Sequence, residues 1–244
     1  MILQGELDPA PADGCARTGG DTRRKLLDAA ERLFAERGIA AVSMRELTSS
    51  VNANVAAVHY HFGSKEKLIE EVYARGAKAI TDERLRRLEL ARAVRDPDRR
   101  VEALVAAFLE SGLFGGAALP GGVALFAKFR ARLVIESSEF ARSVIATCFN
   151  ESSGRFLDAF REALPALSEA DIEWRFHALL SVMVYTMANS GRIQKLTDGA
   201  CEPTDVRAAL DHLVPALAGM FRAPAGGSPA GNSKPSRVKK ETKK

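Results

Sequence analysis

The stretch SMRELTSSVNANVAAVHYHFGSK, residues 43–65, decides the fold of the N-terminal part of the chain. It begins with an S-x-x-E pattern, in which the Ser43 side chain and Glu46 can form a capping box. Val42 and Leu47 flank this pattern as the matching hydrophobic staple. These signals predict a short helix over 44–50.

A second short helix is predicted over 55–61, with Asn54 as its N-terminal cap. The two helices are joined by three residues, 51–53. Asn52 lies in this turn and is one of the few non-glycine residues that tolerate a left-handed backbone. Two short helices with such a turn form a helix-turn-helix, whose second helix enters the major groove of DNA.

Outward from this stretch the chain continues to show helical periodicity and no strand-like alternation. A helix over 22–37 precedes it and stops at Gly38, and Ser64 caps a long helix over 65–92. The later helices are expected over 98–113, 122–136, 138–164, 169–196 and 205–221. We therefore predict an all-α protein of about nine helices, with an N-terminal three-helix helix-turn-helix head and a C-terminal helical body.

Composition sets further limits on the class of protein. The 244 residues are 46% hydrophobic and 27% charged, which excludes a largely disordered chain. No stretch approaches the roughly 20 apolar residues of a membrane span, and residues 1–20 lack the pattern of a secretory signal. The three cysteines lie far apart without a CxxC pair, so neither disulfides nor a thiolate zinc site is expected. These features favour a location in the reducing cytoplasm.

Both ends are expected to be disordered: an arm over 1–20 rich in Pro, Gly and Ala, and a basic tail over 223–244. The tail carries six Lys and Arg against one Glu, a net charge of +5. The whole chain has a net charge of +4, so the rest has 4 − 5 = −1. The tail is either a solvated end or a weak, sequence-independent attractor of phosphate.

The residues of the head resemble those of the TetR family of transcriptional regulators. The similar text is LDAAERLFAERG at 27–38, SMREL at 43–47 and VHYHFGSKEKL at 58–68, within a match over 22–68. The family's usual Gly and Val in the turn are here Asn52 and Ala53. The resemblance implies a dimeric, repressor-type protein that is helical throughout. Neither an enzymatic activity nor a cofactor is expected. Its DNA-binding domain would be 21–67, and its regulatory and dimerisation domain 68–222.

Side-chain chemistry assigns roles around the second short helix. Its small residues would let the bases approach, its apolar residues would contact thymine methyl groups, and its polar residues would contact base edges or phosphates. The resemblance implies that Tyr60 and Lys65 hold backbone phosphate. Basic residues elsewhere in the head would contact phosphate or the minor groove. The predicted DNA-binding residues are Thr22, Arg23, Arg24, Arg45, Asn54, Val55, Ala56, Ala57, His59, Tyr60 and Lys65.

Some of these residues have a second interpretation. His59 and His61 are either DNA contacts or packing residues, and Arg23 and Arg24 are either a DNA-binding arm or a solvated helix face. Val58 and Phe62 should point into the head's core. No metal site is expected, because His59 and His61 would point in different directions on a helix.

In the body, the helices over 169–196 and 205–221 each carry more apolar residues than one buried face requires. We expect them to pair with their two-fold mates in a four-helix interface. The residues assigned to this dimer interface are Phe176, Leu180, Met183, Met187, Leu210, Leu213 and Leu217.

An apolar cavity with a few polar groups is also expected in the body. Its lining is predicted to be Phe108, Phe126, Phe129, Arg130, Leu133, Phe149, Asn150, His177, Met183 and Tyr185, although each of these also suits an ordinary core. Such a lining predicts a small hydrophobic or amphipathic effector, with any carboxylate near Arg130.

The leading hypothesis is therefore a cytoplasmic homodimer that binds a palindromic operator in double-stranded DNA and is released by a small effector. The alternative is a constitutive or activating DNA-binding regulator without an inducer. A helical-bundle enzyme is disfavoured, because the paired Glu-x-x-His motifs of a di-iron bundle are absent.

Overall fold

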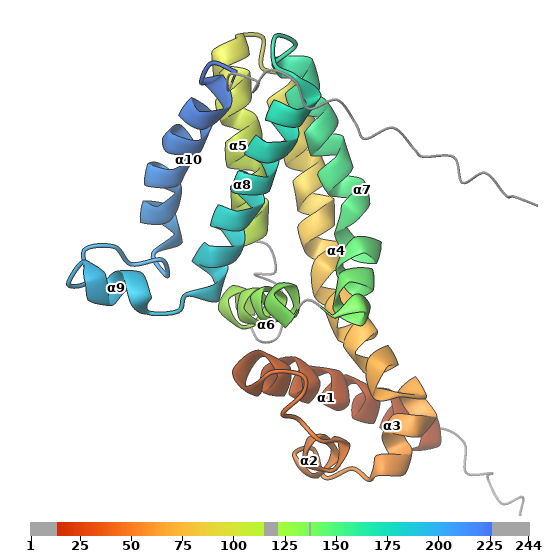
Figure 1. Ribbon diagram of the computed structural model, residues 1–244. Coiled ribbons are helices and arrows are strands. Elements are labelled where there is room, and N and C mark those ends of the chain that lie inside the picture. Colours follow the sequence, from red (N-terminus) through yellow and green to blue (C-terminus); the bar gives the residue numbers. More distant parts are fainter. Residues whose placement is uncertain (1–13, 115–121, 137, 226–244) are drawn as a thin grey trace, which may run out of the picture.

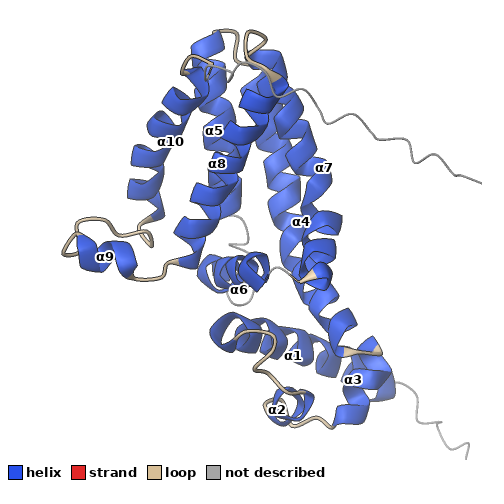
Figure 2. Ribbon diagram, viewed as in Figure 1, coloured by secondary structure: helices blue, strands red, loops and turns tan. Residues whose placement is uncertain are grey.

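The computed structural model describes residues 14–114, 122–136 and 138–225. Within these ranges it is built from ten helices and contains no strand (Figure 2). The helices are α1 (Gly14–Arg37), α2 (Met44–Ser49), α3 (Val55–Phe62), α4 (Lys65–Arg92), α5 (Pro97–Phe114), α6 (Gly122–Glu136), α7 (Glu139–Ala163), α8 (Glu169–Ala188), α9 (Arg192–Leu196) and α10 (Val206–Arg222). The predicted all-α class is confirmed.

The head is formed by α1, α2 and α3, and α4 runs from it into the body (Figure 1). The expected domain boundary between residues 67 and 68 thus falls inside α4. Arg75 of α4 fastens the two parts together, because its guanidinium binds Asp28 and Glu31 of α1, each at 2.6 Å. Helix α6 lies across the junction, between α1 and the rest of the body (Figure 1).

The local signals of the helix-turn-helix are confirmed except for half of the capping box, since the described contact of the Glu46 carboxylate is an ion pair with Arg37 and not a bond to the Ser43 amide. Ser43 Oγ accepts a hydrogen bond from the Glu46 amide at 3.2 Å, and Val42 and Leu47 are buried. Asn52 has a φ of 54°, in the left-handed region. Val58 and Phe62 are buried in the head's core.

Helix α1 is longer than the sequence pattern indicated. Residues 14–20 were expected in a disordered arm, but they continue α1 toward the N-terminus. No proline follows Pro11 before the end of α1, and extending an existing helix requires little free energy compared with starting one. The rest of the arm, 1–13, lies outside the described residues, as does the tail over 226–244.

The predicted helix over 169–196 is also wrong, because it is divided into α8 and α9. Asn189 has a φ of 39° and Gly191 a φ of 73°. Both residue types end helices in this left-handed conformation. The last helix is capped by Asp205, which accepts a hydrogen bond from the Ala208 amide at 3.0 Å.

The C-terminal end of α10 is held by a buried arginine of α8. Arg175 donates to the carbonyl oxygens of Phe221 at 2.6 Å, Ala223 at 2.9 Å and Pro224 at 3.0 Å. These carbonyls lack helical partners, so the guanidinium satisfies them and the partial negative charge of the helix end. The Phe160 and Phe221 rings stack beside this contact at 4.1 Å. This contact holds the N-terminal part of α8 against the C-terminal end of α10.

Candidate nucleic-acid interface and ligand cavity

Helix α3 lies in the part of the head that is remote from the body (Figure 1), and several of its side chains are exposed. Tyr60 is 86% exposed, and its ring meets the edge of His61 at 5.0 Å. Ala56 is exposed, whereas Val55 is half-buried. A small, exposed residue and an unburied phenol on one helix are suited to close approach to a duplex.

The two histidines of α3 lie in different environments. His59 is exposed, and its Nδ1 lies 2.9 Å from the Gly63 carbonyl oxygen. Because a carbonyl only accepts, Nδ1 must carry the proton in this hydrogen bond. In the neutral ring Nε2 is then an acceptor, suited to the amino group of adenine or cytosine. His61 is half-buried against Tyr60 and Phe62, which favours its packing role.

Two of the predicted contact residues have structural duties. Asn54 Oδ1 accepts from the Ala57 amide at 2.8 Å, so Asn54 caps α3 and both N–H donors of its amide nitrogen remain for DNA. Lys65 Nζ donates to the carbonyl oxygens of Ile39 and Val42, each at 2.7 Å. Two of its three donors are therefore directed into the head, where they hold the α1–α2 loop.

The basic residues of α1 and α2 also differ in whether they already form an ion pair within the head. Arg23 forms an ion pair with Glu71 and lies over the Phe62 ring, 5.2 Å from its centroid, so a phosphate contact requires this pair to open. Arg24 is largely exposed and pairs with Asp21 at 2.9 Å. Arg45 is exposed and, among the described residues, forms no ion pair. Thr22 precedes Arg23 and Arg24 on α1 and is half-buried. Ala57 departs from the prediction, because it packs against the head's core.

The body holds a cavity of about 710 Å³ between α4, α6, α7 and α8. Six of the ten predicted lining residues border it: Arg130, Phe149, Asn150, His177, Met183 and Tyr185. The other four predictions are wrong, since Phe108, Phe126, Phe129 and Leu133 are fully buried core residues that do not line it. Helical periodicity identifies the buried face but does not separate a packed core from the wall of a cavity.

Tyr73 and Arg84 also line the cavity, although they were not predicted. Both lie on the buried stripe of α4, with Arg84 between Ile80 and Leu88. The signal for Arg84 was present in the sequence, since a charged residue on an otherwise apolar helical face requires an explanation. Burial raises the pKa of Tyr73 to about 12, so its hydroxyl stays protonated.

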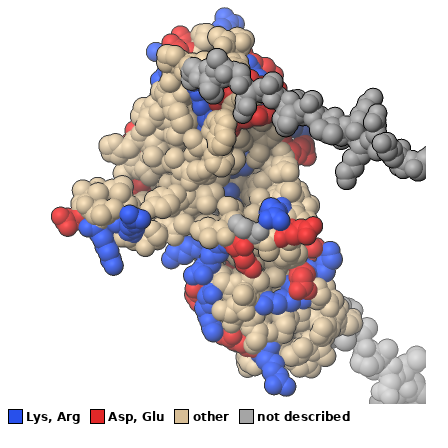
Figure 3. Space-filling view, viewed as in Figure 1, with Lys and Arg blue, Asp and Glu red and all other residues tan. Residues whose placement is uncertain are grey.

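A second apolar hollow, of about 680 Å³, lies between α8, α9 and α10. Trp174 on α8 is 72% exposed, and Tyr185, which borders this hollow, is 56% exposed. Figure 3 shows a broad area with few charged side chains on this side of the body. The exposed apolar face of α8 is therefore the stripe that contains Trp174 and Tyr185.

The residues assigned to the dimer interface must accordingly be corrected. Five of the seven are buried inside their own subunit: Phe176, Met183, Met187, Leu210 and Leu217. Phe176, for example, contacts the rings of Phe108 at 5.2 Å and Phe160 at 6.2 Å. Leu180 lines the cavity and Leu213 lines the hollow. Most of the residues chosen from the sequence therefore pack inside their own subunit, and Leu213 is the one that borders the exposed hollow.

These features define a helix-turn-helix DNA-binding protein with a helical body. Comparison with known proteins places it more narrowly. Residues 26–72 match the model of bacterial regulatory proteins of the tetR family, and residues 102–220 match the Tetracyclin repressor-like C-terminal domain. The chain belongs to the TetR family of transcriptional regulators.

Similar proteins include the transcriptional repressor KstR2 of Rhodococcus jostii, 36% identical over 66 residues, which are 27% of this chain and 32% of KstR2. The regulator BetI of Rhizobium meliloti is 24% identical over 144 residues, 59% of this chain and 66% of BetI. The matches thus span a third to about two thirds of these relatives. None of the helices in the described residues has the length and apolar character needed to cross a membrane.

Solved structures of similar fold cover more of the chain. A regulator from Saccharomonospora viridis in complex with choline is 21% identical, with a TM-score of 0.55 over 80% of this chain and 96% of its own. The TetR family regulator PfmR of Thermus thermophilus is 20% identical, with a TM-score of 0.54 over 84% of this chain and 98% of its own. These similarities show a shared fold.

Proposed function

We propose that the protein is a repressor that binds a palindromic operator as a homodimer and releases it when a small amphipathic effector enters the cavity. Two-fold symmetry of the protein would match the symmetry of the operator, one head to each half-site. The effector site would be the cavity between α4, α6, α7 and α8. The choline-bound neighbour supports the view that this fold accommodates a small molecule.

One observation carries the proposal: α6 contacts both the cavity and the head. Arg130 of α6 borders the cavity. One residue earlier, Phe129 stacks on Phe34 of α1 at 5.9 Å. Two residues later, Arg132 donates to the Glu36 carbonyl oxygen of α1 at 2.9 Å. A displacement of α6 at the cavity would therefore also displace α1.

The consequence for DNA binding follows from differential affinity. An effector that binds more tightly when α6 is displaced favours the conformation in which α1 and the head have moved. Two heads in a dimer would then no longer match the spacing of the half-sites. The same coupling requires operator DNA to weaken effector binding by an equal factor.

Dimerisation would use the exposed faces of α8 and α10. The Trp174–Tyr185 stripe and the adjoining hollow together form an apolar surface on a body whose other faces carry ion pairs. Large exposed apolar patches of this kind mark protein interfaces. A second copy of the chain would bury them in a two-fold arrangement.

The test selects fragments of the source genome that the purified full-length chain binds, and measures affinity for a selected operator by fluorescence anisotropy. A lower affinity in the presence of a small molecule that binds the cavity would support the proposal. Equal affinity for every cavity-binding molecule would refute it and favour the alternative of a constitutive regulator. A reporter gene behind the operator would separate repression from activation.

A further inference from the structure

The inner part of the cavity contains two arginines whose charges no carboxylate neutralises. Arg84 of α4 and Arg130 of α6 are both buried and both line the cavity. Among the described residues, neither forms an ion pair with Asp or Glu. Buried charges in proteins are usually paired, because leaving water is costly for an ion. Two buried arginines without carboxylate partners in one cavity therefore require an explanation.

Arg130 is partly compensated by its surroundings. Its Nη1 donates at 2.8 Å to the carbonyl oxygen of Gly112, near the C-terminal end of α5. The last carbonyls of a helix carry a partial negative charge, which favours a cation. Arg130 shares the cavity wall with Tyr73, and its guanidinium carbon lies 4.9 Å from the centre of the Phe149 ring. Its Nε is nevertheless buried without a partner.

Arg84 has weaker partners. Its Nε donates to Ser111 Oγ at 3.2 Å, and its Nη2 lies 3.9 Å from the Met183 sulfur. The ring of Phe108 lies 4.1 Å from its guanidinium carbon. A guanidinium has five N–H donors, so within the described part of the chain most of those of Arg84 have no hydrogen-bond partner. Burial, together with the nearby charge of Arg130, lowers the pKa of Arg84 to about 9.

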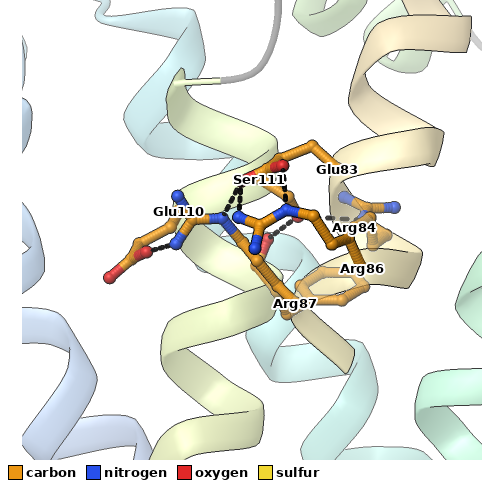
Figure 4. Close-up of polar contacts among 7 residues, drawn as sticks. Glu83, Arg84, Arg86, Arg87, Glu110 and Ser111 are labelled. Carbon is orange, nitrogen blue, oxygen red and sulfur yellow. Dashed lines mark hydrogen bonds and ion pairs between the residues drawn. The ribbon is translucent and has the colours of Figure 1, made fainter. Parts of the chain in front are cut away.

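The nearest carboxylates in the sequence are bound elsewhere. Figure 4 shows that Glu83 turns to Arg86 and Arg87, and that Glu110 turns to Arg87. Their charges are used in these outer pairs. Arg84, on the inner side of α4, keeps only the Ser111 hydroxyl among the labelled groups (Figure 4). Within the described part of the chain, no carboxylate is placed to balance the two arginines, which leaves this role to a ligand.

We propose that the cavity selects an amphipathic carboxylate, whose head group lies between Arg84 and Arg130. The apolar body of the ligand would contact Ile145, Leu180, Val184 and Met187, which line the same cavity. This inference rests on the proposed function only in taking this cavity as the effector site. Two like charges at the inner end disfavour a cationic ligand of the same size.

Space for the head group depends on the packing at Gly112. A Cβ atom at this position would lie 2.2 Å from the Met183 sulfur and 3.5 Å from Arg84 Nη2. Glycine therefore lets Met183 lie against α5 while Arg84 stays beside it. Methionine is flexible and readily changes its rotamer. The Met183 side chain can withdraw from the guanidinium as a carboxylate approaches.

The experiment uses the full-length protein without DNA and measures binding by isothermal titration calorimetry. The probes are the straight-chain carboxylates from hexanoate to dodecanoate, their primary amides as neutral isosteres, and the matching alkylammonium ions. We expect the best carboxylate to bind about tenfold or more tightly than its amide, as charge-assisted hydrogen bonds require, and the ammonium ion to bind least. Equal affinity of acid and amide along the whole series, or no binding by any acid, would overturn the proposal.

Variants assign the preference to the two arginines. Arg84→Met and Arg130→Met should each reduce the ratio of acid affinity to amide affinity, and Arg84→Lys should retain part of it. The control is Arg155→Met, which removes the same charge from an exposed site on α7 outside the cavity. A ratio unchanged in both Met variants would show that the arginines have a structural role only. The amide affinity reports whether each variant keeps a folded cavity.

Operator release is measured separately, which distinguishes this proposal from the preceding one. If carboxylates bind with the expected selectivity but leave operator affinity unchanged, the head-group assignment stands and the inducer function fails. If a neutral molecule releases the operator and carboxylates do not bind, the inducer function stands and the head-group assignment fails.

Discussion

Some residues of the head lie where DNA contacts are predicted and also support the backbone of the head. Asn54 and Lys65 lie where DNA contacts were predicted, yet each holds the backbone of the head through hydrogen bonds. Residue type and spacing show that a polar group is present near DNA. They do not show which of its atoms is already used, because that depends on the positions of backbone groups in the folded head.

Asn54 allows the two tasks to be separated. Asn54→Ser keeps a side-chain acceptor for the Ala57 amide, so the free energy of unfolding should change little, whereas Asn54→Ala should lower it by about 1 kcal/mol. If the Asn54 amide nitrogen reads a base, both variants should lose about 1–3 kcal/mol of operator affinity. Urea unfolding and operator anisotropy measure the two quantities. Full operator affinity in Asn54→Ser would limit Asn54 to capping.

Arg84 is expected to reduce the stability of the unliganded fold. Replacing a buried charge by an apolar side chain of similar length often raises the free energy of unfolding, here by about 1–3 kcal/mol for Arg84→Met. Ser111 stays satisfied in the variant, since it donates to the Phe108 carbonyl at 3.0 Å. Urea unfolding of Arg84→Met beside the exposed Arg155→Met measures the difference. A marked loss of stability in Arg84→Met alone would show that the guanidinium supports the core.

At the scale of elements, prediction from sequence succeeded where the signals are local. Capping by Ser43, Asn54 and Ser64 was recognised because each cap binds an amide three residues away. The break between α8 and α9 was missed, although Asn189 and Gly191 are residue types that commonly end helices. The choice between the two stripes of α8 failed for another reason: it depends on how α5, α7 and α10 pack against α8, which the pattern within α8 does not show.

The turn between α2 and α3 offers a direct test of backbone strain. Asn52 has a positive φ, which costs most other residues about 1 kcal/mol. Asn52→Gly should therefore be as stable as the wild type or slightly more stable, and Asn52→Ala should be less stable by about that amount. Thermal unfolding with circular dichroism measures both. Equal melting temperatures for the Gly and Ala variants would contradict the strained turn.

The link between α6 and α1 can be tested at Arg132. Arg132→Ala removes the hydrogen bond to the Glu36 carbonyl at the end of α1. We expect operator affinity without effector to stay nearly unchanged and the effector-induced loss of affinity to decrease about three- to tenfold, a coupling of about 1 kcal/mol. The control is Lys128→Ala, an exposed residue of the same helix. If the effector reduces operator affinity as strongly in Arg132→Ala as in the wild type, the coupling must pass through Phe129 or α4 instead.

At the scale of the whole molecule, the fold could be predicted almost completely, but its surfaces could not. Two buried clusters divide the described chain: one joins the head to the head-proximal parts of α4, α6 and α7, and the other fills the body. Which apolar residues remain outside these clusters is decided by the packing of all the helices together. The cavity residues were predicted in part for the same reason.

Assembly is tested by placing charge on the exposed apolar face. Tyr185→Glu and Leu213→Glu should convert the proposed dimer to monomers, because each places a carboxylate in the apolar hollow between α8 and α10. Leu90→Glu, on an exposed site of α4, is the matched control. Sedimentation velocity over a range of concentrations gives the mass. A dimer that persists in both variants would refute this interface.

Trp174 is the single tryptophan of the chain and lies uncovered on α8. Its indole is therefore an optical probe of the face that the second subunit would cover. As the protein is concentrated, its ultraviolet emission should shift to shorter wavelength, and a collisional quencher such as acrylamide should reach it less often. The association constant can thus be read from the unlabelled wild-type chain.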